Sequence, residues 1–404
     1  MPHRFFSQLG SLVEAAWRRR DYDERAFPEV AVQALADLPP AGHVDGVALA
    51  ASFLRPDGGP WPPQHPSNFG QPPLRVFQGS RFYIEVLCWL DGTTTLHQHG
   101  FSGAFHVLGG SSVHGRYAFR ERRRVNTSMR LGDLELQGVE LLGRGDTRPI
   151  LSGQACIHSL FHLERPSFTV VVRTGVDLDA QPQYDYLKPH VAEDVAPRDR
   201  LLATRDRLWT VLAQADLGAC QRAAEEFVRG ADFQSAWHAL RAAHSLWGDG
   251  EEFARVAGAM REAHGPDVDL LLRVLEQRWW SEHLTGLRRT VSDPDLRFFL
   301  ALLLNVPDRL HLRRCVAERY GGEPGPRIVG WLRQLTRVDA RGRLLVLGLA
   351  VPGLTAEEFL GLAGTLAEGG APEDREPFAT VTAGLARSPL RPLVIANDTQ
   401  MPGL

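Results

Sequence analysis

Two histidines stand one residue apart in the segment Gly92-Thr-Thr-Thr-Leu-His-Gln-His, at positions 97 and 99. In a β-strand the side chains of residues i and i+2 project from the same face, so His97 and His99 would share one interior while Gln98 points away from it. Two imidazoles placed in this way can bind one metal ion. We therefore predict a metal-binding motif on a strand of a β-barrel. The alternative is a pair of surface histidines on an amphipathic strand.

A third ligand would have to come from a neighbouring strand. The candidates are His158 and His162, in the segment Ile157-His-Ser-Leu-Phe-His-Leu-Glu-Arg-Pro. The chain between His99 and this segment is long enough for strands that leave the site and return to it. Local spacing does not choose between the two histidines, so both remain candidate ligands. The one that does not bind metal could serve as a hydrogen-bond partner of the site.

The two histidine segments belong to two longer motifs. In the first motif, the run Leu87-Cys-Trp is followed by a Gly-containing turn, small hydroxyl residues and His-x-His. In the second, Ala155-Cys-Ile-His is followed by Pro166 and the strand Phe168-Thr-Val-Val-Val-Arg. With these motifs, residues 75–174 resemble the cysteine dioxygenase family of thiol dioxygenases, which belongs to the cupin superfamily.

The resemblance implies a metal site with open positions. His97, His99 and His158 would hold iron(II), and His162 falls where the family usually has Asn. Ala104 stands where most cupins carry a fourth ligand, a glutamate. Because a methyl group cannot coordinate a metal, three imidazoles would leave room for oxygen and substrate.

Further pocket residues follow from the same resemblance. Arg75 lies near the place where the family positions an arginine that holds the substrate carboxylate by a bidentate contact, and Arg81 competes with it for this role. His106 shares a strand face with Ala104 and is a further candidate to line the cavity.

The sequence also departs from the family on the strand of the second motif. The family presents Ser, His and Tyr toward the iron, whereas this chain has Thr169, Val171 and Arg173. Arg173 would point into the pocket, where a guanidinium suits a carboxylate, a phosphate or a stacked guanidinium. The alternative is that Arg173 pairs with Asp177 or Asp179 at the end of the barrel. We infer an oxygenase pocket adapted to another substrate.

The distribution of residue types along the chain predicts an α+β multidomain protein, in which a β-jelly-roll (cupin) barrel is followed by an all-α domain. Residues 1–54 have helical spacing, residues 55–185 begin with a Pro/Gly-rich loop and continue as the barrel, and residues 198–390 are helical again. The later helices suggest stacked antiparallel pairs, as in a solenoid, without a repeat of fixed period. The predicted strands are 81–90, 94–99, 104–109, 113–120, 129–136, 148–151 and 167–174. The predicted helices after the barrel are 198–215, 219–229, 232–246, 250–263, 267–286, 294–305, 307–319, 326–337, 341–350 and 355–368. Asp293-Pro294 and Thr355-Ala-Glu-Glu are the signals of helix starts.

Composition limits the partners. The 404 residues include 45 basic and 48 acidic ones, mixed along the chain, for a net charge of −3. This balance predicts neither nucleic acid nor a membrane as the main partner. The four cysteines are widely separated and predict no disulfide framework, which together with the N-terminal sequence suggests the cytoplasm.

These features favour a mononuclear non-haem iron oxygenase that acts with O2 on a small amino-acid-like or thiol substrate. An alternative is a non-catalytic metal-binding sensor or scaffold whose helical domain binds a protein partner. A third hypothesis is an oxygenase whose helices hold a peptide substrate.

Overall fold

A computed structural model describes residues 2–57, 59–65, 69–90, 95–177, 182–196 and 201–338, together with 361 and 390–393. The chain forms two compact units, which are described separately. Unit 1 comprises residues 1–118, 136–181 and 283–404, and unit 2 comprises residues 119–135 and 182–282. The histidines of interest all lie in unit 1.

Three helices open unit 1 and lie within the segment 1–54, for which the sequence predicts helical spacing. Buried residues recur every three or four positions along the first of them, at Leu9, Val13 and Trp17, which gives this helix one apolar face. Asp45 caps the third helix by accepting a hydrogen bond from the backbone N–H of Ala48 at 2.7 Å. The helices are α1 (Pro2–Arg18), α2 (Phe27–Asp37) and α3 (Gly46–Phe53).

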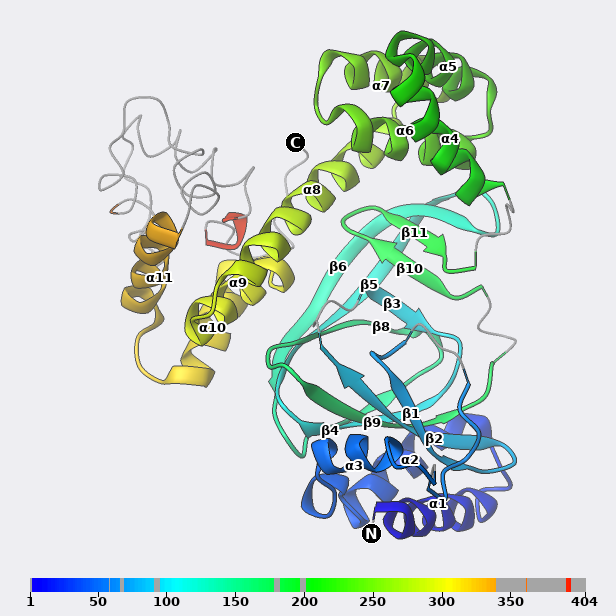
Figure 1. Ribbon diagram of the computed structural model, residues 1–404, viewed down its shortest axis with the longest axis vertical. Helices are drawn as coiled ribbons and strands as arrows, with labels where there is room; N and C mark the ends of the chain where they lie inside the picture. The colour runs from blue at the N-terminus through cyan, green and yellow to red at the C-terminus, as the bar shows by residue number, and fades with distance from the viewer. Residues whose placement is uncertain are drawn as a thin grey trace. The chain divides into compact units, whose positions relative to one another are not determined.

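Five antiparallel strands form the first sheet, in the order β1–β2–β9–β4–β7. Alternate residues such as Val86 and Val172 pack with the residues of α1–α3, which lie along this sheet (Figure 1). Their neighbours Leu87 and Val171 belong to a separate apolar cluster on the opposite face. The strands are β1 (Pro73–Gln78), β2 (Phe82–Trp89), β4 (Gly103–Gly109), β7 (Thr147–Ile150) and β9 (Ser167–Thr174).

The second sheet has the strand order β10–β11–β6–β5–β8–β3 and closes as a barrel. This agrees with the expected cupin-type barrel followed by a helical region. Its strands are β3 (Leu96–His99), β5 (Ser112–Arg124), β6 (Met129–Leu142), β8 (Gly153–His162), β10 (Tyr184–Leu187) and β11 (Val191–Asp194).

Seven strands lie where the sequence predicts them. Strands β1, β10 and β11 were not expected, and β8 was expected only as the strand of His158 and His162, without bounds. For β8 the reason is physical. Its buried positions include His158, Ser159 and His162, so the strand lacks the alternation of apolar and polar residues that marks a half-buried strand. The prolines before β1 likewise hid a strand that begins at Pro73.

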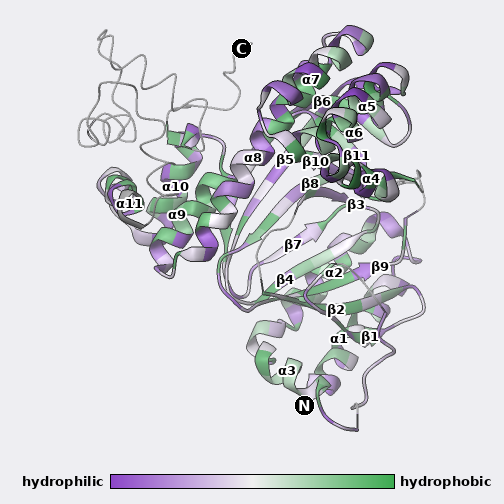
Figure 2. Ribbon diagram, turned by 45° about the horizontal axis from the view of Figure 1, so that its top comes forward, coloured by the Kyte–Doolittle hydropathy of each residue, from purple (hydrophilic) through white to green (hydrophobic). Residues whose placement is uncertain are grey.

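The helices at the end of unit 1 cover the outer side of the barrel strands. Val113 of β5, Val139 of β6 and Phe161 of β8 share one apolar cluster with buried residues of these helices. Helix α9 starts as expected, because Asp293 accepts hydrogen bonds from two backbone N–H groups and Pro294 follows it. The apolar residues of this helix are green in Figure 2. The helices are the end of α8 (Val268–Thr290), α9 (Pro294–Asn305), α10 (Arg309–Tyr320) and α11 (Pro324–Val338).

Unit 2 consists of the tip of the β5–β6 hairpin, β10, β11, four helices and the start of α8. Its core joins strand residues such as Met129 and Val191 to buried helical residues such as Trp237. The stretch 198–390, expected as one helical domain, is thus divided between the two units, and the structure does not show a solenoid. The predicted helices 341–350 and 355–368, with the capping signal at Thr355, lie outside the described residues apart from position 361. The four helices are α4 (Leu202–Ala215), α5 (Leu217–Gly230), α6 (Phe233–Trp247) and α7 (Glu251–His264). Among the described helices of both units, none has the length and apolar character needed to cross a membrane.

Candidate metal centre

Three buried histidines come together in unit 1, between the first sheet and the strands β3 and β8 of the second. His97 and His99 lie on β3, and His158 lies on β8, where its Cα is paired with that of His97. One ring nitrogen from each histidine lies within 4.8 Å of the others. All three side chains are almost completely buried. The pair predicted from the sequence therefore faces the interior, and the reading as surface histidines is wrong.

The ring nitrogens are arranged as metal ligands require. His97 Nδ1 lies 2.7 Å from the carbonyl oxygen of Thr95 and donates to it, which leaves Nε2 as the free ring nitrogen. That Nε2 is buried and has no hydrogen-bond partner. The Nε2 atoms of His99 and His158 lie 2.8 Å apart. A buried acceptor without a partner is costly, and a metal ion shared by these three nitrogens would satisfy it.

Charge also favours metal binding. Burial lowers the pKa of His97, and it holds the pKa of both His99 and His158 well below the usual value for histidine. The three imidazoles are therefore neutral near pH 7, and the neutral imidazole is the form that coordinates metal. The donor set fits an ion such as iron, zinc, copper or nickel, because imidazole suits all of them.

His162 does not belong to this group. It shares a strand with His158, but its ring stacks on Trp89 at 4.6 Å between centroids, and its Nδ1 lies 3.1 Å from Ser112 Oγ. Burial lowers its pKa to about 3. Among the described histidines, the structure therefore offers His158 and not His162 as the partner of His97 and His99.

The cavity beside the three histidines is small and mainly apolar. Its volume is about 30 Å³. The few polar atoms in its wall include the hydroxyl of Thr169, which is buried without a hydrogen-bond partner. Besides the histidines, the wall is formed by Phe69, Glu85, Leu87, Trp89, Phe101, Phe105, Ile150, Leu160, Thr169, Val171 and Arg173.

The strand β4 faces the cavity with different residues from those expected. Ala104 is fully buried in the apolar cluster of the N-terminal helices, on the far side of the sheet. His106, on the same face, accepts a hydrogen bond from the N–H of Ala41 and contacts Thr147 Oγ1 at 2.8 Å, so the expectation that it lines the cavity is wrong. Phe105 faces the cavity instead, with its ring centroid 6.1 Å from that of His158.

Arg173 does line the cavity, as do Thr169 and Val171. Its guanidinium lies 3.3 Å from the centroid of the Phe101 ring and 5.1 Å from that of Tyr83. Burial lowers its pKa. Within the described part of the chain Arg173 forms no ion pair, so the alternative pairing with Asp177 is not observed, and Asp179 lies outside that part.

The other two arginines, Arg75 and Arg81, already have partners. Arg75 forms an ion pair with Glu85 at 3.0 Å and lies 4.0 Å from the centroid of the Tyr83 ring, so its charge is already balanced beside the cavity. Arg81 stacks on Tyr22 at 4.6 Å. Neither lines the cavity wall.

Two further polar residues near the site were missed by the sequence analysis. His114 of β5 is buried, and its Nε2 lies 2.9 Å from His158 Nδ1. Glu140 of β6 lies 2.9 Å from the other nitrogen of His114. The available signal was a polar residue on an inward position of an alternating strand, as in Val113-His-Gly, which is weak by itself.

Comparisons with known proteins add little to this geometry. No family model and no curated protein matches the chain. One solved structure that matches is the DMSP lyase DddQ from Ruegeria pomeroyi DSS-3, with 19% sequence identity, a TM-score of 0.22, and coverage of 35% of this chain and 73% of that chain. A TM-score this low carries no argument about the function of this chain. The closed barrel and its buried group of three histidines agree with the barrel and the metal site that the sequence predicts.

Proposed function

We propose that this protein is a metal-dependent cupin enzyme, specifically a mononuclear non-haem iron oxygenase that acts with O2 on a small amino-acid-like or thiol substrate. The observation that carries the metal site is the buried Nε2 of His97, which has no hydrogen-bond partner. His97 lies in one group with His99 and His158, whose Nε2 atoms are 2.8 Å apart. The sequence resemblance to thiol dioxygenases supports the choice of iron.

The donor set suits open coordination. Iron(II) held by three neutral imidazoles would supply vacant positions for both O2 and a substrate. Most of the residues around it, including Phe69, Leu160 and Val171, have apolar side chains, which would limit the access of water. Exclusion of water protects a reactive oxidation step from side reactions.

Arg173 is the group we expect to hold the substrate. Its buried guanidinium has no carboxylate partner among the described residues, and Phe101 and Tyr83 fix its position. A substrate carboxylate would complete this contact with charge-assisted hydrogen bonds. The hydroxyl of Thr169 is available to a second polar group of the same molecule.

The atom that is oxidised depends on the departures from the family. Sulfur oxidation is what the resemblance implies. However, Arg173 replaces the family's tyrosine, so the pocket lacks at that position the phenol often involved in thiol oxidation. Oxidation at carbon or nitrogen therefore belongs to the same proposal.

The test is anaerobic reconstitution with iron(II), followed by O2-uptake measurements with a panel of thiols and amino acids. We expect one bound iron per chain and O2 uptake with at least one substrate, both lost in His97→Ala. Full occupancy by zinc after expression, combined with no O2 uptake by the iron-loaded protein, would contradict the proposal.

A further inference from the structure

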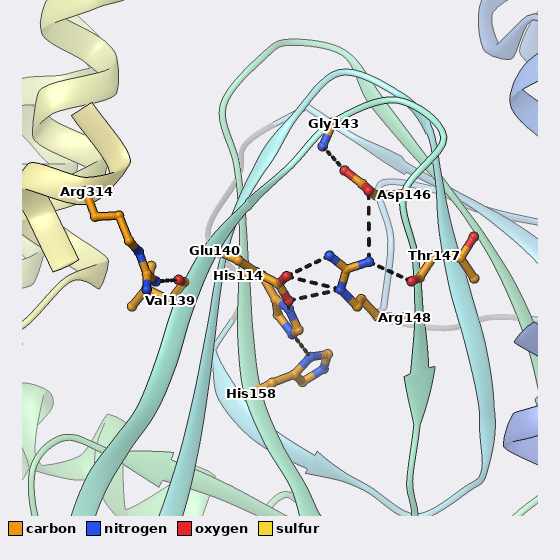
Figure 3. Close-up of polar contacts among 9 residues, drawn as sticks. All are labelled: His114, Val139, Glu140, Gly143, Asp146, Thr147, Arg148, His158 and Arg314. Atoms are coloured by element: carbon orange, nitrogen blue, oxygen red, sulfur yellow. Dashed lines mark hydrogen bonds and ion pairs between the residues drawn. The ribbon is translucent and has the colours of Figure 1, made fainter. Parts of the chain in front are cut away.

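Four polar side chains are linked by hydrogen bonds, from His158 of the histidine group to the partly exposed Arg148 (Figure 3). His158 Nδ1 lies 2.9 Å from His114 Nε2, and His114 Nδ1 lies 2.9 Å from Glu140 Oε1. Arg148 then donates to both carboxylate oxygens of Glu140, at 2.6 Å for the shortest contact. The two histidines are buried, whereas Glu140 and Arg148 are each about one-third exposed.

The donor and acceptor roles along this chain fix one another. An ionised carboxylate only accepts hydrogen bonds, so His114 must donate from Nδ1 to Glu140. The other nitrogen of a neutral His114, Nε2, is then an acceptor. His158 must therefore carry its proton on Nδ1 and donate it to His114. Its remaining lone pair lies on Nε2, the atom that faces the other two histidines.

We propose that His114 and Glu140 are positioning residues of the metal centre, which hold His158 in the one tautomer whose Nε2 can bind the ion. The inference rests on the proposed function only in taking the three histidines as a metal site. A carboxylate that orients a ligand through a second imidazole extends the usual arrangement, in which the carboxylate contacts the ligand directly.

Two contacts hold Glu140 and its strand in position. Arg148 belongs to β7 of the first sheet and Glu140 to β6 of the second, so their ion pair links the two sheets. On the outer side of β6, Arg314 of helix α10 donates to the carbonyl oxygen of Val139, next to Glu140. The helical layer of unit 1 thus supports the strand that carries the carboxylate.

The variant Glu140→Gln should exchange hydrogen-bond donors and acceptors along these side chains with almost no change in their shape. The short contact of Arg148 Nη2 to Oε2 should keep the amide oxygen at that position, which turns the NH2 group toward His114. His114 must then accept on Nδ1 and carry its proton on Nε2, and this N–H points at His158 Nδ1. His158 would be forced to place its proton on Nε2, where it blocks metal binding.

The first measurement reads the tautomers directly. In metal-free protein labelled with nitrogen-15 histidine, two-bond nitrogen–proton spectra distinguish Nδ1–H from Nε2–H rings. We expect Nδ1–H for both His114 and His158 in the wild type, and Nε2–H for both in Glu140→Gln. A wild-type His158 with its proton on Nε2 would overturn the proposal, as would unchanged tautomers in the variant.

The second measurement is the affinity for cobalt(II), followed by its visible spectrum. Glu140→Gln should weaken binding by about 10- to 100-fold, whereas the control His106→Gln, a buried histidine on the far face of β4, should bind as the wild type does. Equal affinity of Glu140→Gln and wild type would overturn the proposal. If His97→Ala has no effect on cobalt binding, the proposal that the three histidines bind a metal is wrong. The tautomer spectra test separately whether Glu140 sets the tautomer of His158.

Discussion

The Nε2 atoms of His99 and His158 face each other across 2.8 Å in the apolar interior of the barrel. They come from strands β3 and β8, which are adjacent in the sheet although some sixty residues separate them in sequence. Two ring nitrogens that each carry a lone pair are expected this close together where a single metal ion can bind both. Its consequences can be tested by removing one ring at a time.

The choice between the two histidines of β8 is the most direct test. We expect His158→Ala to lose the bound metal, with an affinity loss larger than about 100-fold, because it removes a ligand rather than a supporting contact. His162→Ala should retain about one ion per chain, since that ring stacks on Trp89 instead. Metal content after reconstitution and dialysis measures both. The opposite pattern would make His162 the ligand.

The pH dependence of stability should reveal the buried ring of His162. Its pKa is lowered to about 3 in the folded protein, compared with about 6.5 for an unperturbed histidine. Between these values the unfolded chain binds more protons than the folded one, so stability falls as the pH falls. For this one group, the loss from pH 7.5 to 5 is about 2 kcal/mol.

Urea unfolding of the metal-free protein at these two pH values measures this loss. The variant His162→Phe keeps an aromatic ring against Trp89 but cannot titrate. We expect it to lose about 2 kcal/mol less than the wild type on acidification. Parallel losses in the two proteins would mean that His162 is not held neutral by burial.

The buried guanidinium of Arg173 should contribute to binding rather than to stability. Because it forms no ion pair within the described part of the chain, Arg173→Met should leave the ligand-free protein as stable as the wild type or more so. The same change should remove a charge-assisted contact with a bound carboxylate, which contributes about 1.5–3 kcal/mol.

Melting temperatures with and without glycine, cysteine or acetate provide the measurement. We expect at least one of these carboxylates to stabilise the wild type and the control Arg81→Met, whose arginine stacks on Tyr22. Arg173→Met should lose that stabilisation. Should it respond to the carboxylate as the wild type does, Arg173 is not the binding group.

Neighbouring residues of β4 should respond in opposite ways to the same substitution. Ala104→Glu would place a carboxylate among the N-terminal helices, where it has no partner, and should destabilise the protein by at least about 3 kcal/mol. Phe105→Glu would place the carboxylate beside His158, where a bound ion can pair with it. We expect the cobalt-loaded Phe105→Glu protein to fold and to show an altered visible spectrum. A normal spectrum in Phe105→Glu, or a stable Ala104→Glu, would reverse the assignment of the two faces.

Much of the site follows from local geometry, which is why the sequence predicted it. The period of two in a strand places His97 and His99 on one face, and it places Thr169, Val171 and Arg173 together in the cavity wall. These relations need only neighbouring backbone units. Similarly, Asp293 with the following proline started a helix as expected.

The same rule could not say which face is the inner one. Ala104 and His106 do share a face, but it is the one that packs against the N-terminal helices. The face is decided by which element covers it, and the family comparison placed Ala104 on the wrong side. Phe105 was overlooked for that reason.

Sequence alone therefore predicted that two imidazoles share one interior of a β-barrel and that an arginine lines it. Tertiary structure decided the rest. His158 and His162 lie four residues apart, so alternation places them on the same face of β8, and only the pairing of β8 with β3 brings His158 beside His97. The contacts of His114 and Glu140 likewise depend on three strands that meet only in the folded barrel. Register between distant strands is fixed by the packing of the whole sheet, and no local pattern records it.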